Sequence, residues 1–484
     1  MENKVIKEIE KGNNNLTRED LYDFQKVIYN RFKDENNAAL LMDMGTGKTP
    51  TTISLIRYKY GMAGGVLPTI IFCPVIVLEN WVDELTTWTK LDKKFIGVVK
   101  GTPKKRLEAI ENPNHKIIIV NYEALRSDAV AEALVKRKFQ IAVCDESHRI
   151  KTYKSIACRK VLKVTKTCTV FKAILSGTPI TNDIKDIWSQ FLFLDGGATF
   201  GNRMSVFKAK YMVQYIPPDS NYPVWTTNPA RTDEFAQLLA TRAARVNTED
   251  VIDLPEMNIT KLDIELSKEQ KKHYDEVVKE LITWLGEADD NPLIVKNALT
   301  KILRLNEISS GFMKLMDGTI HKFKTNPRLD ACIELVESSA PHKVIIFCIF
   351  KENYKDLRRE LDKRNIEYVE INGEVSTDEK LAAAASFNNV DSGPRICIAN
   401  TRAAGLGVNL VGARYKIYYT RGFSLDDYLQ SQKRNNRAGA KKYHDALFDY
   451  HLVAPQTIDE KIYKKLLQKK KFSEKLLDIK NILV

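Results

Sequence analysis

Short apolar runs alternate with longer amphipathic stretches along most of the chain. The first half contains five such runs, at residues 38–42, 69–73, 116–121, 140–145 and 172–177. The second half contains five more, at residues 343–348, 367–371, 395–400, 415–420 and 447–453. Continuous apolar runs of this length, separated by helical periodicity, are typical of parallel strands joined by helices. The pattern predicts an α/β chain with two parallel-sheet halves.

A different pattern separates the two halves. Residues from about 186 to 325 are mostly of helical type, most clearly at 266–285 and 295–308. A loop at 215–231, rich in Pro, Asn and aromatic residues, interrupts this segment. The tail at 457–479 is predicted to form one long basic amphipathic helix, whose lysines are better explained by a solvated face than by a binding surface.

Length and charge add two constraints. At 484 residues the chain exceeds the length at which a single hydrophobic core stops growing, so we expect two main domains. Lys and Arg number 75 and Asp and Glu number 62, which gives a formal net charge of +13. This excess favours a polyanionic partner, although charge alone fits a basic protein without one equally well.

Cysteine usage and the N-terminus bear on location. The seven cysteines are scattered without a CxxC pair, and Cys73, Cys144, Cys348 and Cys397 fall inside apolar runs, where cysteine behaves as a small buried hydrophobe. This usage predicts a reducing compartment and no structural zinc. The charged N-terminus lacks the apolar core of a signal peptide, and no stretch approaches the roughly 20 apolar residues of a membrane span. We therefore expect a cytoplasmic protein.

A glycine-rich turn follows the first apolar run and precedes a helical stretch. Glycines in such a turn let backbone N–H groups approach a phosphate, a lysine reaches the β- and γ-phosphates, and a hydroxyl can hold Mg²⁺ at the helix N-terminus. A strict P-loop has Gly or Ala where Met42 stands, so the match is to GxGKT only. The predicted phosphate site consists of Gly45, Thr46, Gly47, Lys48 and Thr49.

An acidic pair ends another apolar run. Asp145 is positioned to bind Mg²⁺ and Glu146 to polarise an attacking water, provided that the chain bends there, because neighbouring residues on a strand point to opposite sides. Alone, the pair could be an exposed acidic turn. Its position downstream of the glycine-rich turn favours catalysis.

Three further residues are ambiguous when taken alone. Gln25 begins a helix before the P-loop, where its amide could contact adenine bidentately, although an isolated glutamine is more often a surface residue. Arg434 and Arg437, three positions apart on a predicted helical face, could act as arginine fingers on a γ-phosphate. A solvated basic face is the commoner fate of such a pair.

The order of these segments resembles that of superfamily 2 helicases, specifically the Swi/Snf-type DNA translocases, over nearly the whole chain. Residues similar to the family's motifs lie at 21–25, 42–49, 71–85, 120–125, 145–148, 175–180, 344–357, 401–410 and 430–439, followed by a closing strand and brace helix beginning at 451–466. Several of these motifs are weak individually, but together they follow the family's order.

The resemblance implies a fold and roles for residues. It implies two RecA-like lobes: lobe 1 at 1–250 with a helical insertion at about 186–250, and lobe 2 at 251–484 with an insertion at about 267–325 and a brace helix at about 456–480. It implies an ATP site on lobe 1 with fingers from lobe 2, coupling through Ser176, Gly177 and Thr178, and contacts with the DNA backbone. The implied DNA contacts are Asn121, Tyr122, Thr401, Arg402, and Cys348 with its neighbours.

Some positions depart from the family. Tyr22 and Asp23 stand where Arg-Pro is frequent, and Asn436 and Ala440 replace a usual His and Gln. The cluster of basic residues that the family favours between the lobes is reduced to Arg245 with Asp250. None of these changes removes a catalytic group.

The implied function is an ATP- and Mg²⁺-dependent DNA translocase or helicase acting on duplex, forked or junction DNA, with recombination or replication proteins as partners and a bacterial or phage-infected cell as its setting. Residues 207–239 resemble the insertion of the fork-remodelling branch, which favours branch migration. There, Tyr215, Tyr222 and Trp225 could stack on exposed bases, but the preferred interpretation is that the loop buries their rings. The alternatives are a remodeller that displaces proteins from DNA and the motor of a restriction system.

Overall fold

The computed structural model describes residues 21–89, 91–216, 223–286, 292–315, 317–389, 392–401 and 408–477. The chain forms two compact units. Unit 1 comprises Met1–Ile252 with Lys471–Val484, and unit 2 comprises Asp253–Lys470. The expected boundary at 250/251 lies two residues from the observed one. The end of the tail was expected to belong to lobe 2. It belongs to unit 1, because Leu476 and Leu477 pack into the core of that unit.

Unit 1 is built on a seven-stranded sheet in which all the neighbouring strands are parallel. Its order is β3-β4-β2-β5-β6-β1-β9. The strands are β1 (Asn37–Met42), β2 (Thr69–Cys73), β3 (Ile96–Val99), β4 (Ile117–Asn121), β5 (Ile141–Asp145), β6 (Phe171–Leu175) and β9 (Ala243–Val246).

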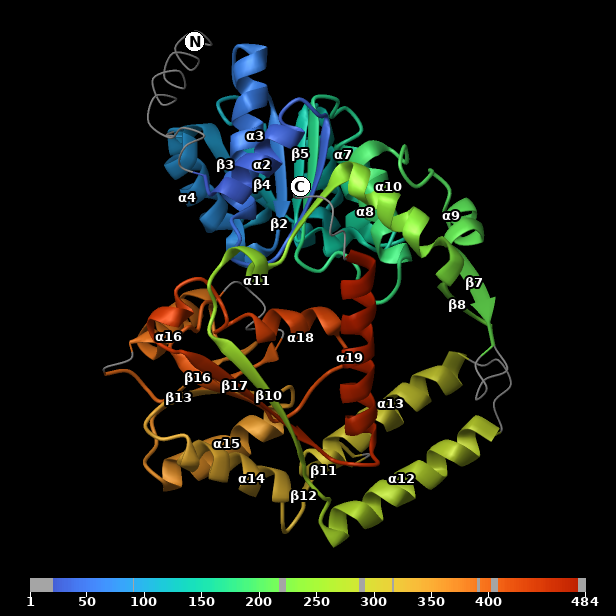
Figure 1. Ribbon diagram of the computed structural model, residues 1–484, viewed down its shortest axis with the longest axis vertical. Helices are drawn as coiled ribbons and strands as arrows, with labels where there is room; N and C mark the ends of the chain where they lie inside the picture. Colours follow the sequence, from blue (N-terminus) through green and yellow to red (C-terminus); the bar gives the residue numbers. More distant parts are fainter. Residues whose placement is uncertain are drawn as a thin grey trace. The chain divides into compact units, whose positions relative to one another are not determined.

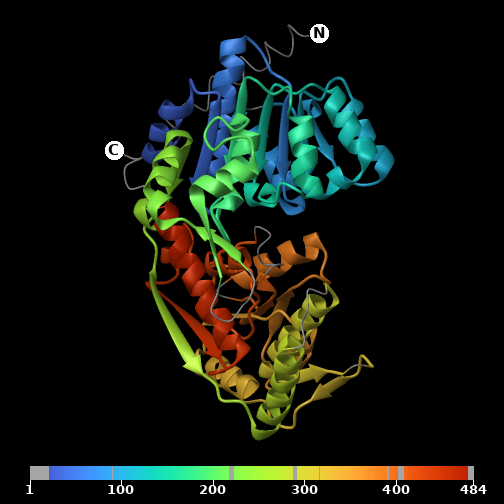
Figure 2. The ribbon, with the colours of Figure 1, turned by 90° about the vertical axis from the view of Figure 1, so that its right-hand side faces the viewer.

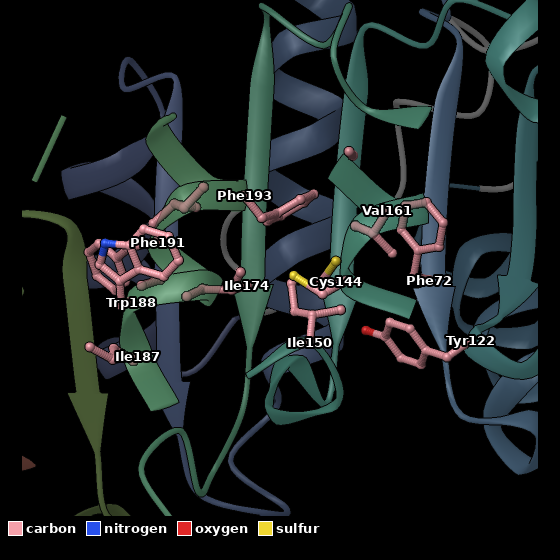
Figure 3. Close-up of a cluster of buried hydrophobic side chains, with 14 of the residues drawn as sticks. Phe72, Tyr122, Cys144, Ile150, Val161, Ile174, Ile187, Trp188, Phe191 and Phe193 are labelled. Atoms are coloured by element: carbon pink, nitrogen blue, oxygen red, sulfur yellow. The ribbon is translucent and has the colours of Figure 1, made fainter. Parts of the chain in front are cut away.

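Helices cover both faces of this sheet (Figures 1 and 2). One face packs against α2 (Asp23–Phe32), α3 (Lys48–Ala63) and α4 (Leu78–Thr89). The other packs against α5 (Pro103–Glu111), α6 (Asp128–Lys136), α7 (Ile156–Val164) and α8 (Lys185–Asp195). Alternate strand residues enter the two cores, as the period of a strand requires. Figure 3 shows Phe72, Cys144 and Ile174 on the second face with aromatic residues of α8.

The remainder of unit 1 is the insertion that precedes the linker. It consists of α9 (Met204–Tyr211), an antiparallel hairpin of β7 (Met212–Tyr215) and β8 (Val224–Thr227), α10 (Thr232–Arg242) and α11 (Thr248–Val251). Tyr215 and Trp225 are 48% and 36% exposed, so the expectation that these two rings are buried is wrong. Tyr222 lies outside the described residues.

Unit 2 contains a six-stranded sheet, also parallel throughout, with the order β10-β17-β16-β13-β15-β14. Its strands are β10 (Glu256–Asp263), β13 (Lys343–Phe347), β14 (Tyr368–Ile371), β15 (Ile396–Ala399), β16 (Ala413–Tyr418) and β17 (Ala446–Val453). The helices beside them are α14 (Pro327–Ser338), α15 (Lys351–Lys363), α16 (Thr377–Asn388) and α18 (Leu425–Gln432). Two parallel sheets with flanking helices confirm the expected fold class.

The helical insertion of unit 2 is a pair of neighbouring helices, α12 (Lys268–Gly286) and α13 (Pro292–Ser309) (Figure 1). They are followed by a small antiparallel hairpin of β11 (Phe312–Lys314) and β12 (Ile320–Lys322). The predicted tail helix is α19 (Ile458–Leu477). Its start is fixed by Asp459, which is fully buried and forms ion pairs of 2.6 Å with Arg328 and 3.1 Å with Arg421.

Candidate active site

Three candidate segments lie together at the carboxyl edge of the unit 1 sheet. Strands β5, β6 and β1 are consecutive neighbours, and because they are parallel their carboxyl ends meet at one edge. The acidic pair follows β5, the segment 176–178 follows β6, and the glycine-rich turn follows β1. In open α/β sheets this edge is where ligands bind.

The turn after β1 has the shape of a phosphate cradle. Gly45 and Gly47 have φ angles of +81° and +78°, in the left-handed region that favours glycine. The hydroxyl of Thr46 donates a 2.7 Å hydrogen bond to Asp43 O inside the turn. Helix α3 begins at Lys48, so its free N–H groups and positive dipole end lie directly after the cradle.

Gln25 supports this cradle. It is buried in the first turn of α2, where its Oε1 accepts a 3.0 Å hydrogen bond from Tyr22 N. Its Nε2 donates a 3.0 Å hydrogen bond to Thr46 O. A Cβ at Gly47 would lie 2.1 Å from the same Nε2. In this structure the amide therefore positions the turn, and its predicted contact with adenine stays a prediction.

The Lys48 side chain bends back along its own turn. Its Nζ donates hydrogen bonds of 3.0 Å to Met42 O and to Asp43 O. Thr49, the next residue, is half-buried at the same helix end. The ammonium group and the hydroxyl thus lie beside the cradle that the glycines form.

The acidic pair lies at a bend of the chain, as its predicted role in catalysis requires. Asp145 is the last residue of β5, and Glu146 has a φ of +50°, which turns the chain away from the strand direction. Asp145 accepts 2.9 Å hydrogen bonds from Trp81 Nε1 at one oxygen and from Glu146 N at the other. Glu146 Oε2 lies 3.3 Å from His148 Nδ1.

Electrostatics distinguish Asp145 from an ordinary surface carboxylate. Burial, together with the neighbouring negative charge of Glu146, raises the pKa of Asp145 to about 6. The hydrogen bond from Trp81 and the charge of Lys48 act in the opposite direction. Two enclosed carboxyl groups that disfavour each other's charge are a suitable set of ligands for a cation.

The segment after β6 is tied to the acidic pair. Ser176 Oγ accepts a 3.1 Å hydrogen bond from Thr178 N, and Gly177 packs close to the backbone of Met42 and Asp43. Gln190 of α8 accepts a 2.7 Å hydrogen bond from Ser147 Oγ. Its Nε2 donates a 2.8 Å hydrogen bond to Pro179 O. Gln190, which sequence analysis missed, thus joins the segments after β5 and β6.

Arg245 on β9 is a second residue whose role sequence analysis did not find. Its Nη1 donates to Leu41 O at 2.9 Å and to Gly177 O at 3.2 Å, and its Nη2 lies 3.2 Å from Asp43 Oδ1. The other oxygen of Asp43 accepts a 3.2 Å hydrogen bond from Thr248 N, at the start of α11. One guanidinium therefore holds the end of β1, the segment after β6 and the strand that leads into the linker.

The predicted DNA contacts of unit 1 face the protein interior. Asn121 is buried and its Oδ1 accepts a 2.7 Å hydrogen bond from Ala124 N. Tyr122 is buried against Phe72, and its hydroxyl donates a 2.7 Å hydrogen bond to Asp145 O (Figure 3). In this structure both side chains support the site instead of being presented to solvent.

In unit 2, Thr401 lies at the carboxyl edge of the sheet, just after β15. It lines a cavity of about 340 Å³ together with Asn400, Arg421, Phe423 and Asp427, among others. Cys348 is buried after β13. Arg402 lies outside the described residues.

The two predicted arginine fingers do not share a helical face. Helix α18 ends at Gln432, and Arg434 and Arg437 lie in the irregular turns that follow. Arg434 is fully buried, and its Nη1 donates a 2.9 Å hydrogen bond to Val408 O. Burial lowers the pKa of Arg437. The expected helical pairing is wrong because the chain leaves the helix at Lys433, before either arginine.

The residues of unit 1 fit a nucleotide with a divalent cation. The observation that supports this fit is the cradle itself, in which a Cβ at Gly47 would collide with Gln25, with an ammonium group beside it and two carboxyl groups at the end of β5, two strands away along the same sheet edge. Thr49 and Asp145 are the residues that would hold Mg²⁺.

Among the described residues, no helix has the length and apolar character needed to cross a membrane.

Three related proteins match almost the whole chain. An uncharacterized ATP-dependent helicase of Mycoplasma genitalium is 25% identical over 469 residues, covering 96% of this chain and 43% of that protein. A chromodomain-helicase-DNA-binding protein 1-like of Danio rerio is 26% identical, covering 92% and 42%. Protein p41 of Acyrthosiphon pisum secondary endosymbiont phage 1 is 24% identical, covering 94% and 97%. The chain thus spans less than half the length of the first two relatives and nearly all of the third.

Among solved structures, a Sulfolobus solfataricus SWI2/SNF2 ATPase core in complex with dsDNA is 24% identical, covers 96% of this chain and 94% of that one, and has a TM-score of 0.43. Two family models match this chain. The model of the helicase conserved C-terminal domain matches residues 327–439. The model of the SNF2-related domain matches residues 14–312, more than half of the chain and the whole of the site at β1, β5 and β6, so the protein belongs to the SNF2-related family.

Proposed function

We propose that the protein is an ATP-dependent DNA translocase or helicase. The observation that carries this proposal is the meeting of three segments at one sheet edge: the cradle after β1, the acidic pair after β5 and the segment 176–178 after β6. A phosphate cradle, carboxylates for a metal and a water, and a linked third segment are the parts that phosphoryl transfer to water needs.

Each side chain then has a defined task. Lys48 would exchange its carbonyl partners for phosphate oxygens, and Thr49 and Asp145 would hold Mg²⁺, which neutralises charge on those oxygens. Glu146 would orient and polarise the attacking water, with His148 at 3.3 Å holding its carboxylate in place. Gln190 would transmit a displacement of the segment after β5 to the segment after β6, because it is bonded to both.

The guanidinium groups of unit 2 have different tasks in this proposal. Arg437, the more accessible of the two, would stabilise charge on the transferred phosphoryl group. Arg434 would fix the turn that carries it through the bond to Val408 O, and would reach a nucleotide only if that turn rearranged.

DNA is the proposed track. The net charge of +13 favours a polyanion, and two of the relatives carry helicase names. A motor must step on any sequence, so contacts should address phosphates and not base edges. Thr401, at the cavity after β15, offers a hydroxyl for such contacts.

The exposed hairpin favours forked or junction DNA over plain duplex. Tyr215 and Trp225 are solvent-accessible on β7 and β8, and Lys208 Nζ lies 5.3 Å from the centroid of the Trp225 ring. Aromatic rings beside a cation can stack on unpaired bases of any sequence. Branch migration in recombination, repair or replication fits this surface, and the phage relative of nearly equal length is consistent with a phage setting.

The first experiment tests the ATP site. Lys48→Ala and Glu146→Gln should abolish DNA-stimulated ATP turnover while leaving DNA binding in a gel shift largely intact. The matched controls are Lys104→Ala and Glu108→Gln, at exposed positions of α5, which should retain normal turnover. Normal turnover in either site variant would disprove the site assignment.

The second experiment identifies the track. ATPase stimulation is measured with single-stranded, duplex, forked and four-way DNA and with RNA. We expect the strongest stimulation by branched DNA, and Tyr215→Ala with Trp225→Ala should weaken the response to branched DNA by about 5-fold or more while sparing duplex. Tyr443→Ala, at an exposed tyrosine of unit 2, is the control. Stimulation by RNA alone would defeat the DNA assignment, and an equal response to duplex and branched DNA would defeat the role of the hairpin.

A further inference from the structure

A cluster of two histidines and a glutamate lies in unit 2, within its helical insertion. Glu269 and His273 are four positions apart on α12, so they project from the same face of the helix one turn apart. His321 comes from β12, in the hairpin that follows α13. Two elements separated by about fifty positions in the chain therefore contribute to one cluster.

The spacing of the potential ligand atoms suits a metal ion. One nitrogen or oxygen from each of the three residues lies within 4.8 Å of the other two. His321 Nε2 lies 3.4 Å from Glu269 Oε1. Two ligands about 2.1 Å from a tetrahedral zinc ion are themselves about 3.4 Å apart, so this pair already has the required separation. His273 supplies the third potential ligand atom, within 4.8 Å of the other two.

Neighbouring groups orient the ligands as they do in metal sites. Nδ1 of His273 lies 3.1 Å from Glu276 Oε2, so Nε2 is the nitrogen that remains available to bind a metal ion. A carboxylate on the second ring nitrogen fixes the tautomer and makes the first nitrogen a better ligand. The second oxygen of Glu269 accepts a 3.0 Å hydrogen bond from Lys324 N, which holds that carboxylate in place.

The cluster also has a rigid support. Phe323 is buried in a small apolar core with Tyr274, Leu305 and Ile308, and its ring centroid lies 5.2 Å from that of His321 and 5.8 Å from that of His273. All three ligand side chains remain partly exposed, so an ion has access from solvent. Without a metal, the contact between Glu269 and His321 would be a partly exposed ion pair, which contributes little to stability.

We propose that Glu269, His273 and His321 bind one divalent transition-metal ion of the zinc class, with water as the fourth ligand. The ion joins the hairpin β11–β12 to α12 and so fixes the geometry of the insertion. The sequence predicted no structural zinc because the cysteines lack metal-ligand spacing, and this site uses none of the cysteines, all of which are buried. The sequence contains the Glu-x-x-x-His spacing of α12, but no motif near His321 indicates that it is the third ligand.

The test uses the full chain, stripped of metal with a chelator and dialysed. Zinc chloride is titrated in competition with a chromogenic chelator, and cobalt chloride is titrated while the visible absorption is recorded. We expect one zinc per chain, a rise in the midpoint of thermal unfolding on adding zinc, and a cobalt spectrum typical of tetrahedral nitrogen and oxygen ligands.

Variants decide whether these residues form the site. His273→Ala, His321→Ala and the nearly isosteric Glu269→Gln should each abolish stoichiometric binding, and Glu276→Gln should weaken it by about 10- to 100-fold. His342→Ala, a change at a half-buried histidine of the same unit beside Arg414, should bind zinc normally. The proposal would be overturned if the unaltered protein bound no stoichiometric zinc, or if the His321 and Glu269 variants bound zinc as tightly as the unaltered protein. Circular dichroism of each variant separates lost ligation from lost folding.

Discussion

The indole Nε1 of Trp81 donates a 2.9 Å hydrogen bond to Oδ2 of Asp145, the carboxylate at the end of β5. The other oxygen of Asp145 accepts from Glu146 N. Hydrogen bonds to the ionised form lower a pKa, whereas burial and the charge of Glu146 raise it, and the balance lies near 6. Trp81 is therefore one of the groups that keep a buried carboxylate ionised at neutral pH.

Trp81→Phe should shift the pH dependence of ATP turnover. In the proposed site the ionised form of Asp145 would hold the cation, so kcat/KM should fall as the pH drops through about 6. Loss of the indole donor should raise the pKa of Asp145, which moves the acidic limb of the profile to higher pH. Trp188→Phe, at a buried indole that donates to Gly201 O, is the control. An acidic limb that coincides in the Trp81 variant and the unaltered protein would contradict this role.

Gly47→Ala should disable the cradle for two separable reasons. The residue has a φ of +78°, and a Cβ there would lie 2.1 Å from Gln25 Nε2. We expect ATP turnover to fall by about 100-fold, since strain and collision together cost about 3 kcal/mol. Adding Gln25→Ala removes the collision but not the strain, so the double variant should recover part of the loss. Gly61→Ala, inside α3 with open space around it, should be neutral or slightly stabilising. No recovery in the double variant would show that Gln25 does not limit the cradle.

The sequence predicted the central strands of both sheets and missed strands that lie at or near their edges. All ten predicted apolar runs form strands; nine lie between two other strands, where a strand covered on both faces is apolar, and only β14 lies at an edge. The strands that were missed include β3, β9 and β10, each at the edge of its sheet. β3 and β9 have four residues each, and β10 carries exposed polar residues, so pairing with a neighbour and not local composition makes them strands.

In the candidate site, too, some features could be predicted from the sequence and others could not. The cradle and the acidic pair were predictable because their chemistry depends on short contiguous motifs. The bond between Trp81 and Asp145 joins residues 64 positions apart, and that between Arg245 and Asp43 joins residues 202 positions apart. The hydrophobic periodicity of the sequence, which extends over a few neighbouring residues, cannot predict contacts between residues so far apart. The assignment of Arg434 to a helix failed because a three-residue spacing cannot show where α18 ends.

Arg245→Gln should destabilise unit 1 and weaken the cradle. The guanidinium is mostly buried and its removal would leave Asp43 enclosed without its cationic partner, which costs about 3 kcal/mol. The double variant with Asp43→Asn should be more stable than the sum of the single effects implies, and this excess measures the coupling of the pair. The comparison is Arg242→Gln, which breaks an exposed ion pair with Glu35 and should cost under about 1 kcal/mol. Strictly additive effects of the two single changes would contradict the coupling.

Asp459→Asn should destabilise unit 2 in a pH-dependent way. Burial alone would raise the pKa of Asp459, but Arg328 and Arg421 outweigh it and hold the pKa below its usual value of 3.8. A lowered pKa in the folded state means that the charged form stabilises the fold above about pH 4, and that this contribution is lost as the pH falls further. The variant should lose about 3 kcal/mol at neutral pH, because two guanidinium groups stay buried without their anion. Calorimetry at neutral pH and near pH 3.5 measures the difference, which should shrink at the acidic end. Glu460→Gln, at the adjacent and more exposed carboxylate, should change the unfolding midpoint little at either pH. A deficit that stays constant from neutral to acidic pH would mean that Asp459 is not the charge that organises the start of α19.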